Sequence, residues 1–213
     1  MKHFENIKQR VLQNNLFSDR QIGTFEIVEG KIRLQFDVSR PIWYIEKIDD
    51  RLQCFNKILT QTKCADVAIW EFDDQGRWTL HIIEAKETVD VSGNSRGWGH
   101  IKRQFLGALI RCQMLAGVFG IRFDRVVFYT AFVNDNISRR LKPTPEEYDT
   151  EDTSNYRVLP DASSPWFEWQ TGRFHLYGTD WSDDYASMTF SHRQIPLTES
   201  TDGMYEPMDS ITL

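Results

Sequence analysis

The chain has 213 residues, of which 40% are hydrophobic and 13% aromatic, and its formal net charge is −6. These values suit a single enzyme-sized globular domain with enough apolar material for its own core. No apolar run approaches the length of a membrane span, and the first residues are too polar for a signal peptide, so we expect a cytoplasmic protein without membrane association. Three widely spaced cysteines, Cys54, Cys64 and Cys112, indicate reduced thiols rather than a disulfide framework.

The charge is unevenly distributed along the chain. Residues 1–119 carry 17 basic and 15 acidic side chains, whereas residues 120–213 carry 8 and 16. A net negative charge argues against indiscriminate nucleic-acid binding by the whole surface, because affinity for phosphates comes chiefly from lysine and arginine. Between residues 89 and 111, however, four basic residues accompany a single acid, Asp90. This stretch predicts a local positive patch.

The first part of the chain predicts one helix followed by strands. Residues 2–16 place Phe4, Ile7, Val11 and Leu12 at helical spacing, which is typical of an amphipathic helix. Glu5 on this helix could be an additional site acid, but a solvated residue is the simpler interpretation. Strands are expected over residues 23–28, 31–38 and 43–48, and with the hairpin that follows they should form a mostly antiparallel sheet.

The next two segments predict a β-hairpin. Residues 64–72 and 77–86 are rich in β-branched and aromatic side chains, and a turn sequence separates them. A three-residue loop of Asp74, Gln75 and Gly76, with the glycine in the left-handed conformation, sets the pairing of the strands. In this register Asp66 lies opposite Glu84. A slip of one residue would instead send Asp66 to the other face of the hairpin.

Asp66 and Glu84 end an apolar face of the hairpin. Side chains alternate along a strand, so Glu84 and Lys86 share a face with Asp66 and with the apolar residues Ala68, Trp70, Phe72, Trp78, Leu80 and Ile82. Two neighbouring carboxylates that are partly out of water require positive charge. Lys86 supplies some of it, and a divalent cation bound by both carboxylates would supply more. The alternative is a pair of solvated acids that Lys86 merely screens.

The segment after the hairpin predicts a loop and the longest helix. Residues 88–99 are rich in glycine, serine and asparagine and indicate a mobile loop over the acids. Residues 100–119 have a broad apolar stripe, which indicates a helix buried on two sides. Its narrow polar strip contains His100, Arg103, Gln104, Gly107 and Arg111.

The remainder predicts a central strand and a β-rich C-terminal part. Residues 125–133 are nearly continuously apolar, as in a strand covered on both faces. A polar, acidic excursion is expected over residues 134–161. Short strands are then expected over residues 166–170, 173–178 and 185–195, followed by a flexible acidic tail over residues 197–213.

Asp66 on one strand and Glu84-Ala85-Lys86 on the next resemble the motif of the PD-(D/E)XK nuclease superfamily, in which an acid near the start of one strand precedes a D/E-x-K on the following strand. The similarity covers residues 63–133 and departs at Ala65, where the family often has a proline that holds no metal. It implies a single α/β domain with a restriction-endonuclease-like core, in which a mixed central β-sheet is flanked by helices. This core would cover about residues 1–133, with a C-terminal β-rich extension over residues 134–196.

The resemblance also implies Mg²⁺-dependent hydrolysis of phosphodiester bonds in nucleic acid, with Mn²⁺ able to substitute. The implied function is a DNA endonuclease of a restriction, defence or repair system, with DNA favoured over RNA. Asp66, Glu84 and the carbonyl of Ala85 would hold the ion, and Lys86 would orient the attacking water or stabilise the transition state. On the long helix, Gln104 or Arg103 would lie beside the metal.

Contacts with the nucleic-acid backbone are expected from the basic stretch, at Arg96, His100, Lys102 and Arg103. His100 is also an alternative general base. The acidic balance of the chain implies that tight binding needs a homodimer or a separate recognition subunit. Two other interpretations stay open: a catalytically inactive PD-(D/E)XK-like assembly module, and an unrelated α/β binding protein in which the hairpin acids are solvated.

Overall fold

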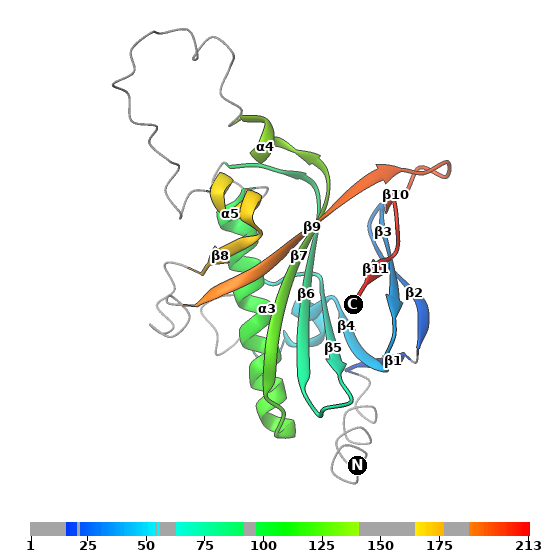
Figure 1. Ribbon diagram of the computed structural model, residues 1–213, viewed down its shortest axis with the longest axis vertical. Coiled ribbons are helices and arrows are strands. Elements are labelled where there is room, and N and C mark those ends of the chain that lie inside the picture. Colours follow the sequence, from blue (N-terminus) through cyan, green and yellow to red (C-terminus); the bar gives the residue numbers. More distant parts are fainter. Residues whose placement is uncertain are drawn as a thin grey trace, which may run out of the picture.

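The computed structural model describes residues 16–20, 22–53, 55, 63–91, 97–140, 165–176 and 188–213, and these form a mixed α/β fold built on one large, strongly bent sheet (Figure 1). Its strands are β1 (Ser18–Arg20), β2 (Gly23–Glu29), β3 (Ile32–Val38), β4 (Ile42–Glu46), β5 (Val67–Phe72), β6 (Trp78–Val89), β7 (Phe123–Asp135), β8 (Arg173–His175), β9 (Thr189–Glu199), β10 (Tyr205–Pro207) and β11 (Ile211–Thr212). The helices are α2 (Ile48–Arg51), α3 (Trp98–Phe119), α4 (Asn136–Arg140) and α5 (Pro165–Thr171).

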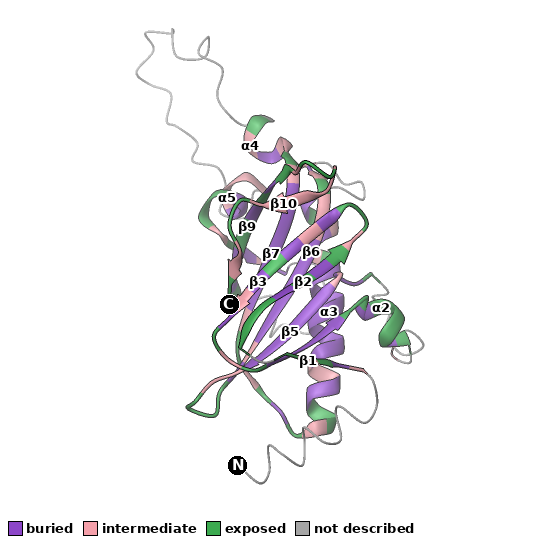
Figure 2. Ribbon diagram, turned by 90° about the vertical axis from the view of Figure 1, so that its right-hand side faces the viewer, coloured by how far each residue is buried: buried purple, intermediate pink, exposed green. Residues whose placement is uncertain are grey.

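The strand order gives the sheet two layers. The path runs β1-β4-β5-β6-β7-β9-β10-β3-β11, with β2 paired to β3 and β8 to β9. Strands β4, β5 and β6 are antiparallel, whereas β6, β7 and β9 are parallel. The long strand β9 crosses from the main layer to the small layer of β2, β3, β10 and β11. Figure 2 shows the small layer in front of the main layer, with α3 behind it.

Each face of the main layer covers its own hydrophobic core. The face toward α3 is strongly aromatic, and its fully buried side chains include Trp70, Trp98, Phe105, Phe128 and Trp169. The face toward the small layer is built from Phe36, Ile69, Ile83, Tyr129 and other apolar residues. Burial of one such side chain stabilises the fold by about 1.5–3 kcal/mol. The main layer is therefore an interior sheet, and a polar residue on either face needs a partner.

The predicted hairpin is confirmed, including its register. Val67 pairs with Ile83 and Phe72 with Trp78, as the proposed loop requires. The amide of Asp73 donates to the carbonyl of Arg77 at 3.0 Å and closes the loop. Gly76 within it has a φ of +80°, the left-handed conformation that favours glycine.

Most of the other predicted elements are also present. The strands expected over residues 23–28, 31–38, 43–48 and 125–133 correspond to β2, β3, β4 and β7, and the helix expected over residues 100–119 is α3. The predicted mostly antiparallel sheet is only partly present. Strands β2 and β3 are antiparallel but lie in the small layer, and in the main layer β7 and β9 run parallel to β6. The N-terminal helix predicted over residues 2–16, with Glu5 and most of its length, lies outside the described residues, as does Cys54. No helix in the described ranges combines the length and the apolar character needed to cross a membrane.

Two predictions for the C-terminal part are wrong. The strand expected over residues 166–170 is the helix α5, which turns Glu168 and Trp169 into the core. A short aromatic run carries no clear period, so helix and strand are hard to distinguish there from sequence. Residues 197–213 do not form the expected flexible tail, because Leu197 is buried and β10 and β11 pair in parallel with β3. Strand β9 pairs in parallel with β7 in the main sheet.

Helix α3 lies very close to the backbone that leads into β5. A β-carbon at Gly107 would overlap the carbonyl oxygen of Lys63. One turn earlier, the amide of Ala65 donates to the carbonyl of Gln104 at 3.1 Å. The absence of a side chain at Gly107 therefore allows α3 to dock against the segment that carries Asp66.

We predict that Gly107→Ala destabilises the protein by roughly 1–3 kcal/mol, the usual cost of overpacking, because the new methyl group must displace the backbone of Lys63. The matched control is Gly117→Ala on the same helix, where a β-carbon meets nothing within 4 Å. This control should gain about 1 kcal/mol from helix propensity. Urea denaturation of both variants checks the prediction, and a Gly107→Ala protein as stable as the wild type would contradict it.

Candidate functional site

The hairpin brings the sequence-predicted acids together. Asp66 immediately precedes β5, while Glu84 and Lys86 lie on β6. One carboxylate oxygen of Asp66 accepts a hydrogen bond of 2.8 Å from the amide of Ala85, between them. In an antiparallel pair the N–H and C=O of one residue face the same neighbour, so the carbonyl of Ala85 points toward the side that Asp66 occupies.

Backbone contacts fix Asp66 from two sides. Its carbonyl accepts a hydrogen bond of 2.8 Å from the amide of Lys47, at the start of α2. Lys47 has a φ of 51°, a left-handed conformation that costs a non-glycine residue roughly 1–2 kcal/mol. On the other side, the bond from Ala65 to Gln104 attaches the same segment to α3. A strained backbone conformation persists only where surrounding contacts hold it in place, and strained residues of this kind are common at functional sites.

Glu84 is the most unusual residue of the site. Its side chain is 0% exposed, on the face of β6 that packs toward α3, and neither of its carboxylate oxygens has a hydrogen bond of regular geometry. The ammonium of Lys86 forms an ion pair with one of these oxygens and is itself 21% exposed. A buried carboxylate normally needs full pairing, because the cost of removing it from water is several kcal/mol. The pair leaves one oxygen without a counter-charge.

The pKa values of both acids are raised. Burial raises the pKa of Glu84 to about 8, and the negative charge of Asp66 adds to the effect, while Lys86 and Gln104 act in the opposite direction. Burial also raises the pKa of Asp66 to about 6, against the lowering effects of the Ala85 amide and Lys86. Two coupled carboxylates of this kind favour a bound proton or a bound cation.

Helix α3 contributes Gln104 and His100 to the site. Gln104 is buried, its amide nitrogen lies 3.3 Å from the carbonyl of Cys64, and its side chain favours the charged form of Glu84. His100 is partly exposed, and its pKa is lowered by burial and by the charges of Lys86, Arg103 and Lys63. Positive charge is therefore gathered at the solvent side of the acids.

The other predicted phosphate-binding residues have different surroundings. Arg103 is exposed on α3. The ammonium of Lys102 instead lies 2.8 Å from a carboxylate oxygen of Glu168, a fully buried residue of α5. Glu168 also accepts hydrogen bonds from the indole of Trp98 and the amide of His175. The ion pair of Lys102 thus connects α3 to α5. Arg96 lies outside the described residues.

A groove borders the site on the side of the small layer. It has a volume of about 320 Å³ and is lined by the β2–β3 turn, Glu29 to Ile32, and by the end of β6, Ala85 to Thr88. Glu29 and Asp49 each raise the pKa of Asp66 through their negative charge. Sequence analysis missed these two acids and Lys47, because only the tertiary fold brings residues 29, 47 and 49 to the start of β5.

The donor set fits a hard divalent cation held by few protein ligands. Within the described ranges, no group of three or more histidine, cysteine, aspartate or glutamate side chains is arranged to hold a metal. Mg²⁺ commonly uses one or two carboxylates and completes its shell with water and phosphate oxygens. The carboxylate of Glu84, paired only with Lys86, and the adjacent Asp66 supply this smaller set.

Comparison of the chain with family models, with curated proteins and with solved structures gives no match. The geometry and electrostatics of the site are therefore the basis for a functional assignment.

The raised pKa of Glu84 predicts a specific pH dependence of stability. The folded protein holds a proton on Glu84 up to a pH of about 8, whereas the unfolded chain releases it near the ordinary value of 4.5. The free energy of unfolding should therefore fall as the pH rises through this window, by at most about 1.4 kcal/mol per pH unit. Glu84→Gln removes the titration, so its stability relative to the wild type should increase between pH 5 and pH 9 in EDTA.

The matched control is Glu87→Gln on the exposed side of the same strand. Urea denaturation should give the same difference in free energy of unfolding between this variant and the wild type at every pH. A constant difference between wild type and Glu84→Gln from pH 5 to pH 9 would show that Glu84 titrates normally.

Proposed function

We propose that the protein is a metal-dependent nuclease of the PD-(D/E)XK type that hydrolyses phosphodiester bonds, with DNA as the favoured substrate. The observation that carries the proposal is the pair of the half-buried Asp66 and the fully buried Glu84, whose only counter-charge among the described residues is the ammonium of Lys86. In this proposal the hairpin of β5 and β6, helix α3 and strand β7 would be the catalytic core within the larger mixed sheet.

The metal ligands in this proposal are one oxygen of Asp66, the carboxylate of Glu84 and the carbonyl of Ala85. A bound Mg²⁺ would lower the pKa of a water molecule and neutralise charge on the scissile phosphate. Asp66 and the Ala85 carbonyl share one side of β6, and Glu84 approaches from the face toward α3. The ordered backbone around Asp66 keeps these donors in place without reorganisation.

Lys86 and Gln104 act next to the ligands. Lys86 is the member of the pair that reaches solvent, so its ammonium can orient the attacking water or contact a phosphate oxygen. Gln104 is fixed by the carbonyl of Cys64 and limits the movement of Glu84. His100 and Arg103, on the adjoining turn of α3, provide the positive charge that attracts the phosphate backbone. Because the chain is acidic overall, tight binding would come from a second copy or a recognition subunit.

We predict that the protein cleaves plasmid or oligonucleotide DNA only with Mg²⁺ or Mn²⁺. Asp66→Asn, Glu84→Gln and Lys86→Ala should each reduce cleavage by about a hundredfold or more, the usual size of effect when charge stabilisation is lost at a reacting centre. Gel-based cleavage assays with DNA and RNA substrates measure this and determine which nucleic acid is preferred.

The control variant for cleavage is Asp74→Asn in the exposed hairpin turn, which should cleave at the wild-type rate. Cleavage by the double variant Asp66→Asn, Glu84→Gln at the parental rate would refute the proposed site. Absence of cleavage together with a stable complex with another protein would support an inactive assembly module instead.

Metal binding can also be measured without catalysis. Because a bound cation needs both carboxylates ionised, Mn²⁺ binding at pH 7 should release protons and raise the melting temperature of the wild type. Calorimetry in buffers of different ionisation enthalpy counts the protons released. Asp66→Asn and Glu84→Gln should lose both effects and Asp74→Asn should keep them. Equal stabilisation of all four proteins by Mn²⁺ would exclude this pair as the binding site.

A further inference from the structure

A second polar site lies on the opposite face of the main sheet. The face toward the small layer is apolar over Ile69, Ile83 and Val127, but it becomes polar near the hairpin turn. There the sheet borders a cavity of about 490 Å³. Its lining includes the polar residues Glu71, Thr79, His81, Arg125, Tyr129 and Arg193. The proposed nuclease site occupies the other face and the other end of β6.

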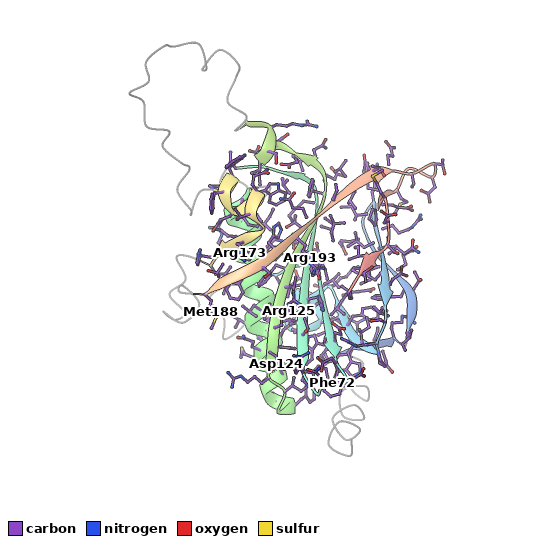
Figure 3. All side chains as sticks on the ribbon, in the orientation of Figure 1. Phe72, Asp124, Arg125, Arg173, Met188 and Arg193 are labelled. Carbon is purple, nitrogen blue, oxygen red and sulfur yellow. The ribbon has the colours of Figure 1, made fainter. Side chains whose placement is uncertain are left out.

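The register of the sheet places two arginines at this cavity. Arg125 on β7 pairs with Thr79 on β6, and Arg193 on β9 pairs with Tyr129 on β7. Figure 3 shows both arginines on these neighbouring strands. Both side chains are exposed, and neither forms an ion pair with any residue that the structure describes. The guanidinium of Arg193 instead lies 5.8 Å from the centre of the Tyr129 ring.

The acids around the cavity are already engaged. Glu71 forms an ion pair with Arg40 at 3.1 Å and accepts a hydrogen bond from the imidazole of His81 at 3.2 Å. Asp73 pairs with Arg77, and Asp124 accepts the amide of Trp78. Asp124 keeps its charge, but Arg125 and Arg193 form no ion pair with any described residue and so can attract an anion in a chain whose formal net charge is −6.

A buried hydrogen-bonded chain supports the floor of the cavity. Burial lowers the pKa of His81 despite the nearby Glu71, so the imidazole is neutral at pH 7 and carries one ring proton. Its Nε2 faces the carboxylate of Glu71, which only accepts, so Nε2–H donates there. Nδ1 then accepts from the hydroxyl of Tyr129, 2.9 Å away. This chain fixes the Tyr129 ring over which Arg193 lies, and so limits the positions open to that guanidinium.

We propose that this cavity binds the phosphate group of a small organic phosphate of about the size of a nucleotide. The planar guanidinium groups of Arg125 and Arg193 match the bidentate geometry of phosphate oxygens, and the hydroxyl of Thr79 adds a donor in the same row of the sheet. The cavity volume lies in the range of small-molecule sites and exceeds what a phosphate ion alone would fill. The site is separate from the proposed nuclease centre and needs no metal.

Calorimetric titration of the full chain in EDTA with AMP, inorganic phosphate and adenosine tests the proposal. AMP should bind, inorganic phosphate should bind more weakly and compete with it, and adenosine should not bind. Equal affinity for AMP and inorganic phosphate would identify free phosphate as the source of the bound group. Binding of adenosine as tight as that of AMP, or no binding of either phosphate, would overturn the proposal.

Variants locate the binding to this cavity. Arg125→Ala and Arg193→Ala should each weaken AMP binding by about tenfold or more, because each removes charged hydrogen bonds worth more than about 1.4 kcal/mol. Both residues are exposed, so the fold should be retained, which circular dichroism checks. The matched control Arg122→Ala removes the same charge just before β7, outside the cavity lining, and should change the affinity by less than about twofold.

Asp66→Asn separates the two sites, because it should abolish Mn²⁺ binding and leave AMP binding intact. Unchanged affinity in Arg125→Ala and Arg193→Ala, or loss of AMP binding in Asp66→Asn, would contradict a separate phosphate site. These outcomes do not depend on whether the protein cleaves DNA.

Discussion

A fully buried carboxylate that faces a second carboxylate requires positive charge, and this requirement organises the ends of β5 and β6. Glu84 has no exposed surface and no regular hydrogen bond, and Asp66 lies beside it with one oxygen on the amide of Ala85. Lys86 offsets only part of the charge. A protein that used these groups for stability alone would gain more from an apolar residue at position 84, because burying an ion pair seldom repays its desolvation. An acidic group retained at this position is better explained by a ligand that can take the place of its proton.

The rest of the fold holds this pair in place. Asp66 precedes β5 by a single residue, so it is fixed by strand pairing on one side and by the amide of Lys47 on the other. Helix α3 can support the same segment because Gly107 leaves room for the backbone of Lys63. Strand β6 then serves two faces, with Glu84 toward α3 and His81 toward the small layer. Because successive side chains of β6 point to opposite faces of the sheet, the two polar sites are kept apart.

The sequence was informative where the determining contacts are local. The register of the hairpin follows from alternation and from Gly76, so the meeting of Asp66 with Glu84 could be anticipated. Gln104 or Arg103 was expected beside them from the family resemblance. Contacts between distant segments could not. The sequence predicted that Lys102 would contact phosphate, whereas in the fold it pairs with Glu168, 66 positions later. The order of residues 197–213 depends on pairing with β3. The arginine-lined cavity likewise assembles from strands far apart in the chain.

The most direct test of the central claim is the anomalous diffraction of crystals grown with Mn²⁺. The account predicts a strong peak between the carboxylates of Asp66 and Glu84, within coordinating distance of an oxygen of each, with Lys86 turned away from Glu84 toward solvent. Crystals that contain Mn²⁺ elsewhere, while Glu84 stays paired with Lys86 and no peak lies beside Asp66, would contradict it.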